Sequence, residues 1–161
     1  MIRPVVLSAI ALMFFGGSAV AAGQTSGDQP SSGQPSLVED FSYPGADKIF
    51  EQRGIRLVKG DGKITLVPCG DWNLLEVRQA GAVKDTDTDP GHFCFQVQGS
   101  SGYLELEVPN TFQIKGDDHA VVATVKVKDQ TNSVPIDKET WTGVGVGAGT
   151  NSAVLLALRA S

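Results

Sequence analysis

The sequence predicts a mainly β domain, an antiparallel β-sandwich or partly closed barrel with one short helix at its N-terminal end. Most of the chain after residue 54 consists of short segments rich in Val, Ile, Leu and Phe, separated by turns of Gly, Asp and Pro. Several of these segments alternate apolar and polar residues with a period of two, which is typical of strands with one buried face. Their regular spacing favours a sandwich or barrel over a fold of alternating strands and helices.

The predicted helix covers residues 44–53. Ala46, Ile49 and Phe50 fall at i, i+3 and i+4 and form one apolar stripe. Gly54 follows where a helix commonly ends in a left-handed residue. We therefore expect a short amphipathic helix that packs on the sheet.

Eight candidate strands follow the helix. In the seventh, Val121, Ala123 and Val125 share a face. Gly60-Asp61-Gly62 separates the first two and predicts a three-residue hairpin loop between them. The eight segments are 55–59, 63–67, 73–78, 93–98, 103–108, 111–115, 120–128 and 153–159.

The first 22 residues have the pattern of a signal peptide. One positive charge, Arg3, precedes an apolar run over residues 4–15 that is shorter than the roughly 20 residues needed to span a bilayer. Small residues follow, and both Ala21 and Ala22 fit the position before a cleavage site. The pattern predicts a secreted, extracellular protein with no membrane insertion after cleavage.

Two further parts of the chain follow this peptide. Residues 23–36 hold only small and polar residues and Pro, a composition typical of a flexible leader. Residues 37–161 form the predicted single domain. Loss of Arg3 with the signal peptide takes the formal net charge from −5 to −6. This balance, without any Lys/Arg cluster, argues against nucleic acid or an anionic membrane as partner.

Cys69 and Cys94 are the two cysteines of the chain, and an even number in an exported protein predicts a disulfide. The spacing is not C-x-x-C, which argues against a redox site, and two cysteines alone do not provide the four ligands of a structural zinc. By alternation the side chain of Cys94 points away from the face of the strand that carries Phe93 and Phe95. It therefore lies on the less apolar face. The bond is expected to tie two strands together or to lie beneath the helix.

The stretch "KDTDTDPGH", residues 84–92, places Asp85, Asp87 and Asp89 at alternate positions. A helical calcium loop needs Gly at its sixth position and Glu at its twelfth. Counted from Asp85, these positions hold Pro90 and Gln96. We therefore interpret the segment as a loop solvated by water, with no metal, although its neighbouring histidine suits metals other than calcium.

His92 and His119 are the histidines of the chain. His119 follows Asp117 and Asp118, which indicates a polar turn. No pattern places a nucleophile, a histidine and a carboxylate together, and the glycine-rich segment 143–149 leads into a strand instead of opening a phosphate-binding helix. The sequence predicts neither an enzyme nor a cofactor.

Trp72, Tyr103 and Trp141 are the candidate ligand-stacking residues, because secreted sandwiches that bind sugars stack the sugar rings on exposed aromatic side chains. Tyr103 shares its outward phase with Glu105 and Glu107, which we interpret as the solvated face of a sheet. For both tryptophans core packing is the favoured interpretation, with Trp72 placed against the disulfide.

The runs "YPGADKIFEQRGIRLVKGDGKITLVPCG", "NLLEVR", "FCFQVQGSSGYLELEVP" and "TFQIKGDDH" resemble small exported domains of actinobacteria. The resemblance covers most of residues 41–128. It implies an exported β domain without an established activity, and it assigns no site residues.

These features together predict a secreted, non-catalytic β domain that binds an extracellular protein or glycan. A carbohydrate-binding module and an inhibitor of secreted proteases are the alternatives.

Overall fold

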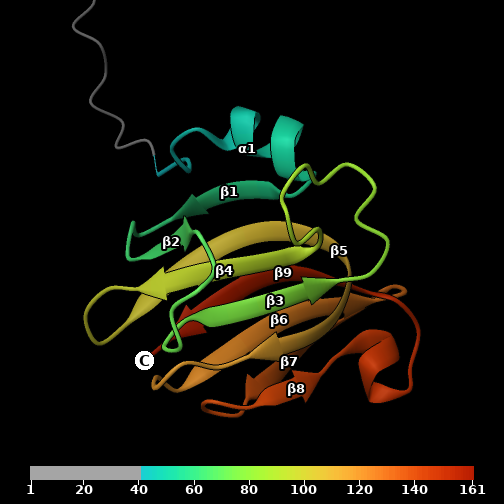
Figure 1. Ribbon diagram of the computed structural model, residues 1–161. Helices are drawn as coiled ribbons and strands as arrows, with labels where there is room; N and C mark the ends of the chain where they lie inside the picture. The colour runs from blue at the N-terminus through green and yellow to red at the C-terminus, as the bar shows by residue number, and fades with distance from the viewer. Residues whose placement is uncertain (1–40) are drawn as a thin grey trace, which may run out of the picture. The chain divides into compact units, whose positions relative to one another are not determined.

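The computed structural model describes residues 41–161, so the predicted signal peptide, the leader and the first residues of the domain lie outside the described residues. Within 41–161 the chain forms nine strands, one α-helix and one 3₁₀-helix, which confirms the mainly β fold (Figure 1). This part contains no helix that is both long and apolar enough to cross a membrane. The elements are α1 Ala46–Arg53, β1 Arg56–Gly60, β2 Ile64–Val67, β3 Leu75–Gln79, β4 His92–Val97, β5 Gly102–Lys115, β6 Val121–Val127, β7 Gln130–Ile136, β8 Trp141–Gly143, η1 Gly145–Ala148 and β9 Ala153–Ala160.

Strand β5 belongs to both halves of the sheet. Its first half pairs with β1 and β9, and its second half pairs with β3 and β8, always antiparallel. The sheet continues through β6 to β7 on one side and through β4 to β2 on the other. Because β2 and β7 end the order without pairing to each other, the sheet is an open, sandwich-like arrangement and not a closed barrel.

The bend of β5 lies between Val108 and Thr111, where its register with β9 shifts. Asn110 has a positive φ of 52° there, a conformation that Asn tolerates better than most residues. The Thr111 hydroxyl donates to the Val108 carbonyl (2.8 Å), and the Asn110 carbonyl accepts the N–H of Ala80 (3.0 Å). The two candidate strands 103–108 and 111–115 are therefore one strand, bent by a residue that a sequence pattern marks only as a break.

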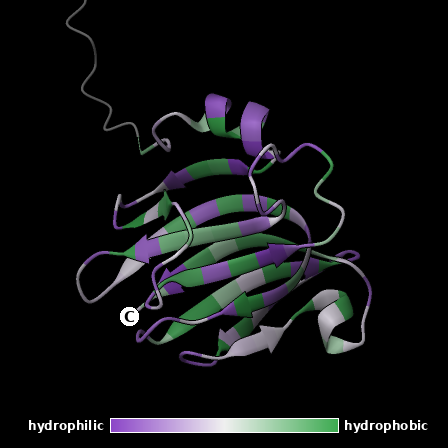
Figure 2. Cartoon of the chain, in the orientation of Figure 1, coloured by the Kyte–Doolittle hydropathy of each residue, from purple (hydrophilic) through white to green (hydrophobic). Residues whose placement is uncertain are grey.

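The core is built from the inward faces of all the longer strands. Figure 2 shows the alternation of hydrophobic and hydrophilic residues along them. The largest fully buried side chains, by volume, are Phe93, Phe95, Ile55, Leu57, Ile64, Leu75, Leu104, Leu106, Ile114, Leu155, Leu158 and Val77. They come from both halves of the sheet, so the apolar contact between the halves stabilises the bend.

The predicted hairpin at Gly60-Asp61-Gly62 is wrong. Strand β1 pairs with β5, and β2 pairs with β4. The Asp61 N–H donates to the Tyr103 carbonyl (3.2 Å), and a Cβ at Gly60 would overlap that same oxygen. The glycine thus permits a close crossing of β5, after which the chain enters the other half of the sheet.

Two strands, β7 and β8, have no counterpart among the candidate strands. β7 is polar and contains Pro135, both unfavourable signs for a strand interior, but it is the last strand of the order and pairs only with β6 in the described sheet. Val127 faces Gln130 across a two-residue turn, so the register of β7 follows from β6. The partner strand determines this element more than its own composition does.

The helix α1 is close to its prediction. It covers Ala46–Arg53, and Gly54, whose φ is 69°, caps its C-terminal end. Ile49 packs against the edge of the core. Phe50 stays 38% exposed, and the Arg56 guanidinium lies 4.5 Å from the centre of its ring. The apolar stripe therefore attaches the helix to the domain without burying any helical residue fully.

The glycine-rich segment after β8 is an irregular continuation of the sheet edge. The Val144 N–H donates to the Phe112 carbonyl (2.9 Å), and η1 follows at once. A Cβ at Gly147 would overlap the Phe112 carbonyl oxygen, so the glycine allows the backbone to lie against β5.

Replacing Asn110 tests the bend. Asn110→Val is expected to reduce the free energy of unfolding by about 1–2 kcal/mol or more, because a β-branched side chain disfavours a positive φ. Asn110→Gly is the control, since glycine adopts this conformation freely. Both are measured by chemical denaturation, and equal losses in the two variants would show that the backbone conformation at Asn110 does not support the bend.

Candidate functional site

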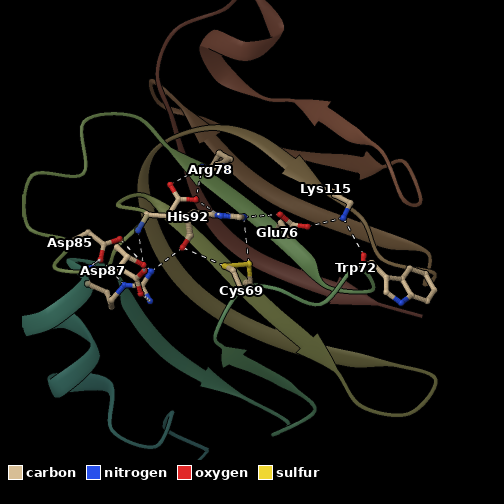
Figure 3. The surroundings of a disulfide bond; sticks show 12 residues. Cys69, Trp72, Glu76, Arg78, Asp85, Asp87, His92 and Lys115 are labelled. Atoms are coloured by element: carbon tan, nitrogen blue, oxygen red, sulfur yellow. Dashed lines mark hydrogen bonds and ion pairs between the residues drawn. A yellow bond between two sulfur atoms is a disulfide. The ribbon is translucent and has the colours of Figure 1, made fainter.

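A row of side chains crosses four strands on the outer face of one half of the sheet, and Figure 3 shows two of its members, Lys115 and Glu76, near the disulfide. Trp141 of β8 stands opposite Lys115 of β5, Lys115 opposite Glu76 of β3, and Glu76 opposite Cys94 of β4. Opposite residues on one face of an antiparallel sheet have Cβ atoms about 4.5–5.5 Å apart. These residues, far apart in the sequence, are therefore direct neighbours.

Charged groups in and beside this row form a continuous chain of contacts. Lys115 Nζ lies 2.7 Å from one oxygen of Glu76, and His92 Nε2 lies 2.7 Å from the other. His92 Nδ1 lies 2.9 Å from Asp89, which also pairs with Arg78 at 3.2 Å. The side chains of Lys115, Glu76 and His92 are only 19%, 14% and 10% exposed. The chain of contacts thus holds three polar side chains in fixed positions at the surface.

The two carboxylates of this chain are stabilised in their ionised form. Burial is the largest single influence on Glu76 and opposes ionisation, but the hydrogen bonds from Lys115 and His92 together outweigh it and lower the pKa of Glu76. The hydrogen bond from His92 is the largest cause of the lowered pKa of Asp89, and Arg78 adds to it. Both groups therefore act as anions that their hydrogen-bond partners hold in place.

Two exposed tryptophans flank Lys115. Trp72, in the segment before β3, is 73% exposed, and its carbonyl accepts a hydrogen bond from Lys115 Nζ (3.2 Å). Trp141 is 38% exposed, with the Arg78 guanidinium 6.0 Å from the centre of its ring. The expectation of core packing is wrong for both, because neither residue lies on the inward face of a strand.

Tyr103 does not belong to this site. It lies on the first half of β5, opposite Arg159 of β9, whose guanidinium is 4.9 Å from the centre of the tyrosine ring. On the same face Glu105 pairs with Lys59 (3.4 Å), and Glu107 lies near Arg56 (3.8 Å). These partly exposed ion pairs confirm the solvated face predicted around Glu105 and Glu107.

The Cys69–Cys94 disulfide is formed, with 5.3 Å between the Cα atoms. It joins the segment after β2 to β4, where Val67 stands opposite Cys94, and so ties two paired strands rather than lying beneath the helix. Cys94 has the outward phase that alternation predicts, yet it is 1% exposed. Closing a loop with a sequence separation of 25 contributes roughly 3–4 kcal/mol in the chain-entropy model.

The acidic loop is organised by Arg53 of α1. Its Nε lies 2.6 Å from Asp85, and its Nη1 lies 3.2 Å from Asp87. The side chain of Asp85 is fully buried and also accepts the N–H groups of Asp87 (3.1 Å) and Gly91 (2.8 Å). The interpretation as a solvated loop is therefore wrong for Asp85. The Arg53 guanidinium supplies the positive charge beside Asp85 and Asp87 that a bound metal ion would otherwise supply.

His119 connects two turns, where the sequence indicated a single polar one. Its Nε2 lies 2.8 Å from the Gly99 carbonyl and its Nδ1 lies 2.8 Å from Asp117. The hydrogen bond to Gly99 is the largest cause of a raised pKa of His119, and Asp117 raises it further, against the opposing effect of burial. Both ring nitrogens face acceptors, an arrangement that a doubly protonated ring satisfies. His119 therefore connects, through two hydrogen bonds, the turns that precede and follow β5.

Sequence reasoning missed Glu76, Arg78 and Lys115 as members of a site. Alternation places Glu76 and Lys115 outside the core of their strands, but it does not reveal that β3 pairs with the second half of β5. His92 was considered only as a neighbour of the aspartates. The missing information was the order of the strands.

Protein-family models and curated proteins were both searched, and neither search found a match for this chain.

Arg53→Ala is expected to reduce the free energy of unfolding by about 3–5 kcal/mol, because it leaves the buried Asp85 without its cation. Arg56→Ala is the matched control. It removes an arginine whose ion pair with Glu107 is exposed, and we expect a loss of about 1 kcal/mol or less. Chemical denaturation measures both, and calcium should not restore Arg53→Ala. Similar losses in the two variants would contradict the role given to Arg53.

The raised pKa of His119 predicts a pH-dependent contribution to stability. The contribution is fully present below the ordinary pKa of histidine, and it is lost as the pH rises through the higher pKa of the folded protein. The difference in melting temperature between wild type and His119→Gln should therefore be largest near pH 6 and should shrink toward pH 9. A difference in melting temperature that is constant or grows with pH would contradict a stabilising role for the protonated His119 ring.

Proposed function

We propose that the protein is an exported, non-catalytic domain that binds an extracellular glycan through the outer face carrying Trp72 and Trp141. The pattern of the first 22 residues supports export, and the disulfide fits an oxidising compartment. The binding face is inferred from the exposed tryptophans and the polar side chains beside them.

The observation that carries the proposal is the exposure of both tryptophans around one lysine. Tryptophan is enriched at binding interfaces, because its ring offers a large apolar surface and its N–H a polar contact. The two residues come from different elements, a loop before β3 and the short strand β8. Trp141 stands opposite Lys115 in the sheet, and the Trp72 carbonyl accepts a hydrogen bond from Lys115. Flat apolar rings beside fixed hydrogen-bonding groups suit sugars, which present both C–H faces and hydroxyl groups.

The polar groups of this face are already positioned before any ligand binds. Lys115 and Glu76 hold each other at 2.7 Å, and Arg78 is held by Asp89. Preorganised groups lose little conformational entropy on binding. A neutral hydroxylated ligand can donate to Glu76 and accept from Lys115 without requiring either ion to lose its partner.

The same contacts favour binding over catalysis. Glycoside hydrolysis uses two carboxyl groups that flank the scissile bond across a cleft. Glu76 is instead held between Lys115 and His92 on the outside of a sheet. This arrangement keeps the carboxylate charged and supports a role in orientation.

A glycan array probed with the full-length protein tests the proposal. Trp72→Ala and Trp141→Ala should each weaken binding by about tenfold or more, since buried aromatic anchors dominate recognition surfaces. Tyr103→Ala is the matched control, an aromatic residue on the other half of the sheet, and it should bind like the wild type.

Two results would overturn this assignment. Equal losses in all three variants would show that the tryptophan face is not the binding surface. Absence of any glycan ligand, together with inhibition of a secreted protease in an enzyme panel, would replace the glycan by a protein partner.

A further inference from the structure

The two sulfurs of the Cys69–Cys94 bond lie in different environments. Cys94 belongs to β4 and is 1% exposed, whereas Cys69 is an exposed residue in the segment between β2 and β3. Thiol–disulfide exchange requires a thiolate to reach one sulfur while the other departs. Access therefore directs attack to Cys69 and makes Cys94 the leaving group.

A histidine stands beside the leaving sulfur. His92 precedes Cys94 by two residues on the same face of β4, and its Nε2 lies 3.5 Å from Cys94 Sγ. The same nitrogen lies 2.7 Å from Glu76, and Nδ1 lies 2.9 Å from Asp89. A neutral imidazole donates from only one nitrogen, so the doubly protonated ring is the form that satisfies both carboxylates. An imidazolium next to a departing sulfur stabilises the thiolate that forms.

Charged groups face His92 from every element that packs around it. Glu76 and Arg78 come from β3, and Arg78 stands directly opposite His92 in the sheet. Asp89 comes from the preceding loop, and Arg53 of α1 donates to the His92 carbonyl (2.9 Å). The two carboxylates contact the ring itself, whereas the two arginine side chains pair with aspartates.

We propose that Cys69–Cys94 is a thiol–disulfide exchange site for a protein dithiol, with His92 as the proton donor to Cys94. The C-x-x-C spacing of common redox proteins is absent, but the fold places an imidazole nitrogen beside the leaving sulfur. The inference is independent of the glycan ligand, because it rests on the disulfide and its contact with His92 and not on the tryptophans.

The exchange is balanced in two steps. A thiolate of the dithiol bonds to Cys69 Sγ, the Cys69–Cys94 bond breaks, and the electron pair leaves with Cys94. The hydrogen of His92 Nε2 then passes from its contact with Glu76 to Cys94 Sγ, which leaves the imidazole neutral. The second thiolate of the dithiol then attacks its own sulfur in the mixed disulfide and releases Cys69 as a thiolate. The dithiol is oxidised by two electrons, and the cysteine pair is reduced by two.

The first experiment determines which sulfur is attacked. The oxidised full-length protein is incubated with glutathione, quenched with acid and mapped by peptide mass spectrometry. We expect the glutathione adduct on Cys69 and a free thiol on Cys94. An adduct mainly on Cys94 would overturn the proposal, and this test needs no variant that changes the fold.

The second experiment measures the role of His92. The rate of reduction by dithiothreitol is followed from pH 5 to 9 for wild type, His92→Gln and the control His119→Gln, which alters a histidine outside this site. At low pH His92→Gln should be slower than wild type by about a hundredfold, the lower end of what a positioned acid contributes. The ratio of the wild-type rate to the variant rate should fall toward one as the pH rises, because a general acid contributes only in its protonated form. The pH dependence of the dithiothreitol thiolate is the same for both proteins and cancels in the ratio.

A loss of stability alone cannot produce this pattern, because a loosened disulfide would be reduced faster at every pH. If the ratio of wild type to His92→Gln is independent of pH, or if His92→Gln is the faster variant, the assignment of His92 is wrong. If the ratio of wild type to His119→Gln changes with pH in the same way, the assignment of His92 is also wrong.

Discussion

The bend of β5 is the constraint on which the rest of the described structure depends. A single strand, Gly102–Lys115, pairs with β1 and β9 before the bend and with β3 and β8 after it. The bend brings the apolar faces of both halves into one core, and it brings β8 and β3 to the two sides of the same short stretch of backbone. The row from Trp141 to Cys94 exists only because β5 changes neighbours at this point.

Most carboxylates that line the functional surfaces are bound by cations of the protein itself. Arg53 holds the acidic loop through Asp85, Arg78 holds Asp89, and Lys115 holds Glu76. The net negative charge of the chain therefore does not create a ready site for a metal in these places. Instead the ion pairs fix loops to strands, as Arg53 does between α1 and the segment before β4.

The proposed binding face and the proposed exchange site share one structural unit. Cys69 anchors the segment that carries Trp72, and Glu76 contacts both Lys115 on the binding side and His92 on the disulfide side. Opening the bond would release one end of the segment with Trp72 while the contact between Lys115 and Glu76 persists. The two proposals nevertheless rest on different atoms, the indole rings in one and the buried sulfur in the other.

The sequence by itself determined which face each long strand buries, because a period of two leaves only one way to exclude water from residues such as Phe93 and Phe95. It also determined which cysteines pair in the disulfide, since each of two cysteines has a single possible partner. It did not determine which strands pair, because alternation is identical whichever neighbour a strand has. For that reason the alternation predicts a hairpin at 60–62 that does not form, and it does not predict the polar strand β7. The exposure of Trp72 was likewise decided by the tertiary structure, because a loop residue has no alternation to follow and its environment depends on segments far away in the chain.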